Sequence, residues 1–109
     1  MTGIQQVSEA EFEKFLLESK CPLIVEFGAK WCAPCKRMKP VIDGLAEKWN
    51  GRAQFLEVDV DESQSLTMRY QVMSVPTLIL IREGSIKSRL IGFQPDQRIM
   101  NEFGPWIGA

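Results

Sequence analysis

Apolar residues recur at the i, i+3, i+4 spacing of one helix face in two segments of the chain. The first segment follows Ser8 and Glu11, which are spaced as an N-terminal capping box. The second ends at Asn50-Gly51, a stop signal for helices, and contains Pro40, where we expect a kink. The apolar positions that define these two predicted helices are Phe12, Phe15 and Leu16, and then Met38, Val41, Ile42, Leu45 and Trp49.

Runs of β-branched and aromatic residues between the predicted helices have strand character. The first two runs are Leu23 to Phe27 and Gln54 to Val60. Thr77 starts an unbroken apolar run to Ile81, as expected of a strand buried on both faces. Because Glu83-Gly84 marks a tight turn directly afterwards, this strand and Ser85 to Ile91 are predicted to form an antiparallel hairpin.

Two further helical segments complete the pattern. Ser63 to Tyr70 is predicted as a short helix, and Asp96 to Phe103 as the last one. We expect Gly104-Pro105 to interrupt or kink this last helix before Trp106 and Ile107. The predicted chain begins with a β/α unit and continues with a strand, a helix, a strand, a helix, a β-hairpin and a final helix. This order predicts an α/β sandwich with a mixed sheet.

Length and composition are those of an ordinary globular protein. A chain of 109 residues rarely supports two cores, and 45% apolar with 25% charged residues argues against disordered, collagen-like and disulfide-dense chains. With 13 basic and 14 acidic residues the net charge is −1, so we expect no broad attraction to nucleic acid or to a membrane. The N-terminus has no basic stretch before an apolar run, and no apolar run is long enough to span a membrane. The expected location is therefore the cytoplasm.

The chain contains no histidine, which excludes several kinds of site. Cys–His and Ser–His–Asp catalytic groups are impossible, as are zinc sites that use histidine. Acid–base chemistry near neutral pH must therefore come from cysteine, lysine or a carboxyl group with a raised pKa.

Two of the three cysteines, Cys32 and Cys35, lie in the segment WCAPCK between a predicted strand and a predicted helix. Cys32 falls at the start of the helix, where unpaired N–H groups and the positive end of the dipole favour a thiolate. Cys35 follows one turn later on the same side, within reach of a disulfide with Cys32. Pro34 suits the first helical turn because it lacks an N–H and fixes φ. We therefore expect Cys32 to act as a nucleophile.

Two cysteines three residues apart also occur as half of a zinc site or as core residues. Here the sequence has no second CxxC motif and no histidine, so zinc lacks ligands within one chain. Core burial does not explain Trp31-Cys32 at a junction between loop and helix. The pattern therefore favours redox chemistry. The third cysteine, Cys21, is interpreted as a buried or half-buried inert residue.

The segment from Val25 to Lys36, VEFGAKWCAPCK, together with Val75-Pro76-Thr77, Gly84 and Gly92, resembles the thioredoxin family. The likeness holds in order and spacing from Ile4 to about Phe103. It implies a single thioredoxin domain over residues 1–109, with a central mixed β-sheet flanked by helices on both faces. It further implies dithiol–disulfide exchange on protein substrates, no metal, and no cofactor beyond the Cys32–Cys35 disulfide. The implied partners are disulfide-containing proteins and a thioredoxin reductase as electron donor, and the implied state is a monomer.

The resemblance also implies roles for individual residues. Cys32 matches the nucleophile of the family and Cys35 its resolving cysteine, while Pro76 matches its cis-proline. Val75 would offer backbone groups to an extended substrate. The remaining residues that would line a shallow substrate groove are Trp31, Ala33, Pro34, Ser74, Ile91 and Gly92.

Glu26 stands inside an apolar strand, where the family often has Asp. Its side chain either reaches solvent at a strand end or is a buried carboxyl with a raised pKa that accepts the proton of Cys35. We favour the buried carboxyl and expect Glu57 to be its neighbour. Gly28 removes a side chain that would have packed under the active site. Met38, Met68 and Met73 are interpreted as packing residues.

Four functions remain open from the sequence. A reductant of protein disulfides is favoured over an oxidant or isomerase of the same fold, because Ala33-Pro34 lacks the histidine that oxidising relatives tend to carry between their cysteines. A thioredoxin-like binding or assembly module would need neither Trp31 nor the complete cysteine pair. A metal-bridged dimer that uses Cys32 and Cys35 from two chains is the fourth alternative.

Overall fold

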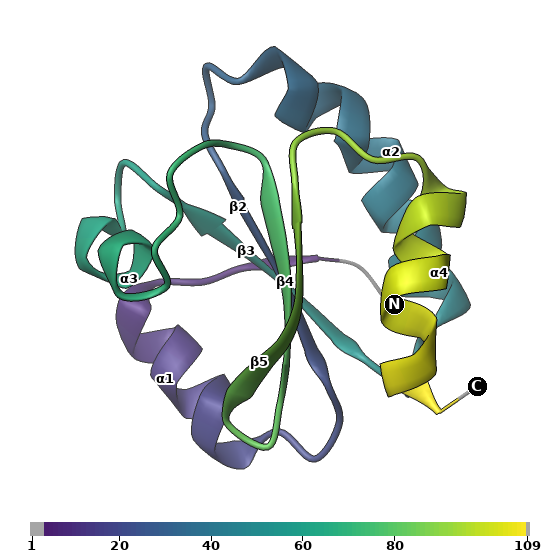
Figure 1. The fold of residues 1–109 in the computed structure, drawn as a ribbon. Coiled ribbons are helices and arrows are strands. Elements are labelled where there is room, and N and C mark those ends of the chain that lie inside the picture. Colours follow the sequence, from purple (N-terminus) through teal and green to yellow (C-terminus); the bar gives the residue numbers. More distant parts are fainter. Residues whose placement is uncertain (1–3, 109) are drawn as a thin grey trace.

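The structure, a computed structural model, describes residues 4–108, in which one five-stranded sheet lies between two layers of helices (Figure 1). The strands are β1 (Gln5–Gln6), β2 (Leu23–Gly28), β3 (Gln54–Asp59), β4 (Thr77–Arg82) and β5 (Ser85–Ile91). The helices are α1 (Glu9–Glu18), α2 (Ala33–Lys48), α3 (Gln64–Arg69) and α4 (Asp96–Ile107). In this described part of the chain, no helix is long and apolar enough to cross a membrane.

The sheet has the strand order β1-β3-β2-β4-β5, with β2 in the middle. Strands β1, β3 and β2 run parallel, whereas β4 runs antiparallel to β2 and forms a hairpin with β5. The two residues of the hairpin turn, Glu83 and Gly84, have φ values of 54° and 82°. Positive φ at both positions belongs to the turn type whose twist matches that of the flanking strands, and glycine adopts it readily. The predicted mixed sheet and hairpin are confirmed.

Successive residues of the central strands point into two separate cores, one on each face of the sheet. In β2, Ile24 packs in a cluster with residues of α2 and α4, whereas Leu23, Val25 and Phe27 pack in a cluster with residues of α1 and α3. Figure 1 shows these helix pairs on opposite sides of the sheet. All six residues of β2 are buried. A β2 side chain on the same face as Ile24 therefore points toward the layer that contains α2.

Most helix boundaries follow the sequence signals. At the start of α1, the Glu11 N–H donates to Ser8 Oγ at 3.2 Å and the Ser8 N–H donates to Glu11 Oε1 at 2.8 Å, so the capping box is confirmed. Helix α2 begins after Cys32, as predicted, and continues through Pro40. The kink at Pro40 stays a prediction. Residues 1–3 and 109 of the predicted domain lie outside the described residues.

The predicted interruption of the last helix at Gly104-Pro105 is wrong, because α4 continues to Ile107. Pro105 is exposed, so water can hydrogen-bond to the helix carbonyl that the missing proline N–H leaves free. Ile107 is buried, and Trp106 is partly buried against the same core cluster. Burial of these two side chains stabilises the last helical turn and offsets the lost hydrogen bond.

The two-sided core leads to a matched pair of stability predictions. Leu80 is fully buried in β4, whereas Leu17 in α1 is 84% exposed. We expect Leu80→Ala to lower the free energy of unfolding by about 2–5 kcal/mol. Leu17→Ala should change it by less than about 0.5 kcal/mol. Urea titration of both variants with the disulfide kept oxidised measures the difference, and equal losses would contradict this assignment of the core.

Candidate active site

One edge of the sheet brings together segments that are distant in the sequence. Phe27 at the end of β2 pairs with Thr77 at the start of β4, and Thr77 pairs with Ile91 at the end of β5. Gly28, the last residue of β2, pairs with Asp59 at the end of β3. The loop before α2, the segment before β4 and the loops after β3 and β5 therefore leave the sheet at the same edge (Figure 1).

Cys32 and Cys35 form a disulfide at the N-terminus of α2, with their Cα atoms 5.3 Å apart. Cys32 is the N-cap residue, and its sulfur accepts a hydrogen bond from the Cys35 N–H at 3.2 Å. Ala33 and Pro34 form the start of the helix, where the N–H groups have no helical partner and proline is well tolerated. The N-terminal N–H groups and the positive end of the helix dipole thus stabilise negative charge on the Cys32 sulfur.

Glu26 is a buried acid in the middle of β2, only 4% exposed. It lies on the same face of β2 as Ile24, so its side chain points toward the layer that contains α2. None of the described residues donates a hydrogen bond to its Oε2 atom. Burial and then the negative charge of Glu57 raise the pKa of Glu26 to about 7, against a smaller opposing effect of Lys39. The buried position and raised pKa are confirmed, and the alternative of an exposed strand end is wrong.

Glu57 is the direct neighbour of Glu26, because the two residues pair in register on the parallel strands β3 and β2. Glu57 is only partly buried, whereas Glu26 is almost fully enclosed. Negative charge on Glu57 therefore favours the protonated form of the more deeply buried Glu26. The expected proximity of the two carboxyl groups is confirmed.

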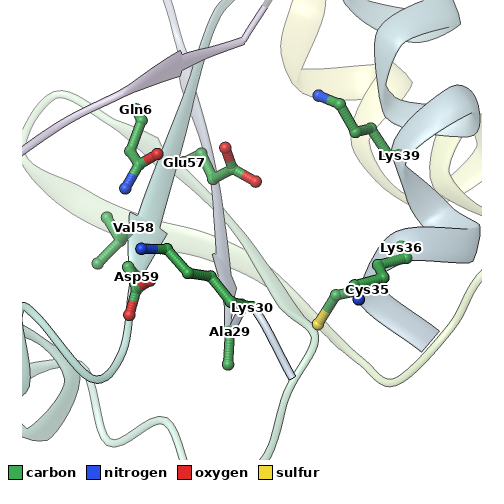
Figure 2. Close-up of a pocket in the computed structure, with 10 residues that line it drawn as sticks. Gln6, Ala29, Lys30, Cys35, Lys36, Lys39, Glu57, Val58 and Asp59 are labelled. Carbon is green, nitrogen blue, oxygen red and sulfur yellow. The ribbon is translucent and has the colours of Figure 1, made fainter. Parts of the chain in front are cut away.

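A cavity of about 230 Å³ lies between α2 and the strands β2 and β3 (Figure 2). The Cys35 sulfur points into it from α2, and the Glu57 carboxylate from β3 (Figure 2). Gly28 forms part of the cavity wall, where an added Cβ atom would lie 3.3 Å from Cys35 Sγ. The absence of a side chain at Gly28 therefore lets the Cys35 sulfur lie close to the end of β2, where even a methyl group would be in tight contact with it.

Trp31 is held by a contact that the sequence did not reveal. Its indole N–H donates to Asp61 Oδ2 at 2.8 Å, although the side chain is 68% exposed. The backbone N–H of Asp61 in turn donates to Oδ1 of Asp59, a buried residue, at 2.8 Å. The acidic run after β3 was the only signal for Asp61, and nothing in the sequence connects it with a tryptophan thirty residues earlier.

Apolar side chains are exposed in several of the segments near this edge. Besides Trp31, Ile91 is 59% exposed and Phe93 is 42% exposed. The Arg37 guanidinium lies over the Phe93 ring, 5.5 Å from its centroid. Met68 is 77% exposed and Met73 is 93% exposed, so the interpretation of these two as packing residues is wrong, whereas Met38 is fully buried as expected.

Between residues 4 and 108, no group of three or more His, Cys, Asp or Glu side chains is arranged to hold a metal ion. The reactive group at this edge of the sheet is the Cys32–Cys35 disulfide.

The comparisons with known proteins identify the family. The family model described as Thioredoxin matches residues 3–103 of the chain. The chain belongs to the thioredoxin family. It is 42% identical over 97 residues to thioredoxins from Staphylococcus aureus strains Mu50 / ATCC 700699 and MW2. These alignments cover 89% of this chain and 91% of each relative.

Solved thioredoxin structures show the same fold. A mutant thioredoxin from Halobacterium salinarum NRC-1 is 28% identical and has a TM-score of 0.86, with 96% of this chain and 91% of that chain covered. A thioredoxin from Nicotiana alata, 24% identical, has a TM-score of 0.87, with 94% and 91% covered, and shows the fold alone. The predicted α/β thioredoxin fold, a central mixed sheet with helices on both faces, is therefore confirmed.

Thioredoxin membership and the bonded cysteine pair together establish the class of activity. The chain is a protein-disulfide oxidoreductase that works by thiol–disulfide exchange. An enzyme of this class uses its own redox-active disulfide as the reacting group. A thioredoxin-like module for binding or assembly alone does not account for these findings.

The thioredoxin resemblance predicted a substrate groove, and the structure brings five of its residues together. The Val75–Pro76 peptide bond is cis. The Gly92 N–H donates to the Pro76 carbonyl at 2.8 Å, which joins the segment before β4 to the loop after β5. Ser74 and Ile91 are exposed on these two segments, and Val75 and Gly92 are partly buried.

The other three predicted groove residues of this thioredoxin domain belong to the active-site loop and the first turn of α2. Trp31 and Ala33 are exposed, and Pro34 is partly buried. Sheet pairing places their segment at the same edge as the cis-proline segment. A role for these residues in substrate binding stays a prediction.

The raised pKa of Glu26 predicts how stability depends on pH. The unfolded chain loses the Glu26 proton near pH 4.5 and the folded chain near pH 7, so the free energy of unfolding should fall as pH rises between these values. Glu26→Gln removes this titration. The free energy of unfolding of the variant, compared with that of the wild type, should therefore be about 3 kcal/mol more favourable to the folded state at pH 8 than at pH 4. Urea titration at a series of pH values measures this gain.

The matched control is Glu47→Gln, which changes an exposed glutamate of α2 in the same way. Its stability should follow that of the wild type across the pH range. Parallel curves for Glu26→Gln and the wild type would show that Glu26 does not titrate near neutral pH.

Proposed function

We propose that the chain reduces disulfide bonds in proteins, with Cys32 as the attacking thiolate and Cys35 as the resolving thiol. The observation that carries this proposal is the position of the Cys32 sulfur at the N-cap of α2, where the Cys35 N–H donates to it at 3.2 Å. A sulfur at a helix N-terminus is stabilised as the thiolate. The thiolate is the form that attacks a disulfide.

Reduction takes two exchange steps. The Cys32 thiolate attacks one sulfur of the substrate disulfide, which forms a mixed disulfide and releases the other substrate sulfur as a thiolate. Cys35 then loses its proton and attacks the Cys32 sulfur, which releases the second substrate thiolate. The substrate gains two electrons, and the protein is left with the Cys32–Cys35 disulfide.

Glu26 is the acceptor of the Cys35 proton in this proposal, either directly or through a water molecule. A carboxyl group with a pKa of about 7 suits proton transfer near neutral pH. Glu57, the register neighbour of Glu26, lines the same cavity as the Cys35 sulfur, and this supports the proposed role of Glu26. The sequence has no histidine that could take this role.

The substrate binds in an extended conformation at the edge of the sheet where β2 ends and β4 begins. Val75 offers its backbone N–H and C=O groups beside the disulfide, in the manner of an added strand. The exposed side chains of Trp31 and Ile91 supply apolar contacts. The other residues of the proposed groove are Ala33, Pro34, Ser74, Pro76 and Gly92.

Family membership supports the remaining parts of the proposal. A thioredoxin reductase supplies the electrons that restore the Cys32 and Cys35 thiols, and disulfide-containing proteins receive them. The chain acts in the cytoplasm as a monomeric single domain over residues 1–109, and it needs no cofactor beyond its own disulfide.

A redox titration distinguishes a reductant from the alternative, a thiol oxidant or isomerase of the same fold. Ala33-Pro34 places no positive charge between the cysteines that would stabilise the reduced form further. We therefore expect the Cys32–Cys35 couple to have a potential near about −270 mV, measured by tryptophan fluorescence in thiol–disulfide buffers. A potential between about −180 and −120 mV would identify an oxidant or isomerase and overturn the proposal.

A further inference from the structure

We propose that the cavity beside Cys35 admits a small zwitterionic thiol, which exchanges with the disulfide at the Cys35 sulfur. This gives the oxidised protein a second entrance, separate from the groove for protein substrates. The inference rests on the proposed dithiol–disulfide function and adds a class of co-substrate to it.

Only one of the two cysteines, Cys35, lines the cavity. Cys35 is partly exposed and contributes to the cavity wall, with its sulfur pointing away from α2 toward the strands (Figure 2). Cys32 is only 3% exposed and does not line the cavity. A molecule inside the cavity therefore meets the Cys35 sulfur first.

Gly28 lies directly beside this sulfur. A Cβ atom at position 28 would lie 3.3 Å from Cys35 Sγ and 3.7 Å from Cys35 Cβ. Any larger side chain would fill the space through which a small molecule approaches. Gly28 is the last residue of β2 and lines the cavity, so a larger side chain at this position would narrow the cavity beside the Cys35 sulfur.

The charges around the cavity define the chemistry of the thiol. Three lysines line it, Lys30, Lys36 and Lys39, together with the acids Glu57 and Asp59 (Figure 2). Both signs of charge are thus available, which matches a molecule that carries a carboxylate and an ammonium group. A cavity of about 230 Å³ is smaller than typical ligand pockets of about 300–1,000 Å³ and suits a thiol of amino-acid size.

Existing ion pairs leave the lysines available. Lys30 lies 3.6 Å from Glu62 and Lys39 lies 3.8 Å from Asp43, and all four side chains are at least half exposed. Exposed pairs of this kind contribute little stability, so a bound carboxylate can replace them.

The exchange at Cys35 conserves atoms and electrons, and its leaving group, the Cys32 thiolate, is stabilised at the helix N-terminus. The thiolate of the small molecule attacks Cys35 Sγ, the Cys32–Cys35 bond breaks, and Cys32 leaves as a thiolate at the N-terminus of α2. A second small thiolate then attacks the small-molecule sulfur of the mixed disulfide and releases Cys35. The protein gains two electrons, two small thiols become one disulfide, and Cys35 takes up a proton.

Trapping the mixed disulfide with L-cysteine tests the proposal directly. The oxidised full-length chain is mixed briefly with L-cysteine and quenched with iodoacetamide, and fragmentation of the tryptic peptide Trp31–Lys36 locates each modification. We expect the cysteine adduct on Cys35 and the alkyl group on Cys32. The adduct on Cys32, or no adduct on either sulfur, would overturn the proposal.

A pair of glycine variants tests the access route. Gly28→Ala should slow exchange with L-cysteine by about fivefold or more, because the new methyl group crowds the Cys35 sulfur. The control Gly44→Ala adds the same methyl group where no atom outside the neighbouring helix backbone lies within 4 Å, and it should leave this rate unchanged. Equal slowing in both variants would overturn the proposal.

Reduction of insulin by the reduced chain is measured with the same preparations. We expect Gly28→Ala to slow exchange with L-cysteine more than insulin reduction, and equal slowing of the two reactions would overturn the proposal. If the wild type reduces insulin but carries the adduct on Cys32, the inference fails alone. If the wild type does not reduce insulin, the proposed function fails.

Discussion

The burial of one carboxyl group in the central strand links the fold of this protein to its chemistry. Glu26 lies in β2, between β3 and β4, in a strand whose six residues are all buried. A charged carboxylate in such a place costs free energy, and none of the described residues donates a hydrogen bond to its Oε2 atom. Because the group can stay protonated up to a pH of about 7, the fold tolerates it, and the same property lets it take a proton near neutral pH.

The sheet also fixes what surrounds this carboxyl group. Parallel pairing of β2 and β3 sets Glu57 beside Glu26, and the strand alternation turns Glu26 toward the layer of α2. Two residues later on the same face of β2, Gly28 lies against Cys35. The direction of the Glu26 side chain and the close approach of Gly28 to Cys35 are therefore consequences of one strand packed under one helix.

The disulfide is placed by the junction between this strand and this helix. Cys32 caps α2 and receives a backbone hydrogen bond, which favours it both as an attacking thiolate and as a leaving group. Cys35 lines the cavity between α2 and the strands β2 and β3 instead. The two sulfurs thus have different neighbours, and on this difference we base the proposal that protein substrates and small thiols approach the same bond from different sides.

Local signals in the sequence predicted much of this arrangement. The capping box at Ser8, the start of α2 after Cys32 and the turn at Glu83-Gly84 depend on residues close in sequence, and all three are confirmed. The strand pattern also identified Glu26 as buried.

What the sequence did not predict depends on tertiary contacts. The predicted β/α start did not give the residues of its strand, because β1 consists of two exposed glutamines without any strand pattern and forms only where β3 offers a parallel edge. Helix α4 continues past Pro105 because Ile107 packs in the core. The bond from Trp31 to Asp61 and the greater exposure of Cys35 than of Cys32 depend on how distant loops meet, so no local pattern indicates them.

The most direct test of the central claim is the pH dependence of the second exchange step. Stopped-flow single turnovers of the wild type and Glu26→Gln with a chromogenic disulfide measure the rate at which Cys35 resolves the mixed disulfide on Cys32. If Glu26 accepts the Cys35 proton, the wild-type rate rises with a midpoint near pH 7, and the variant is slower at that pH by about a hundredfold. Equal rates for the two proteins at every pH would contradict the assignment of Glu26 as the base.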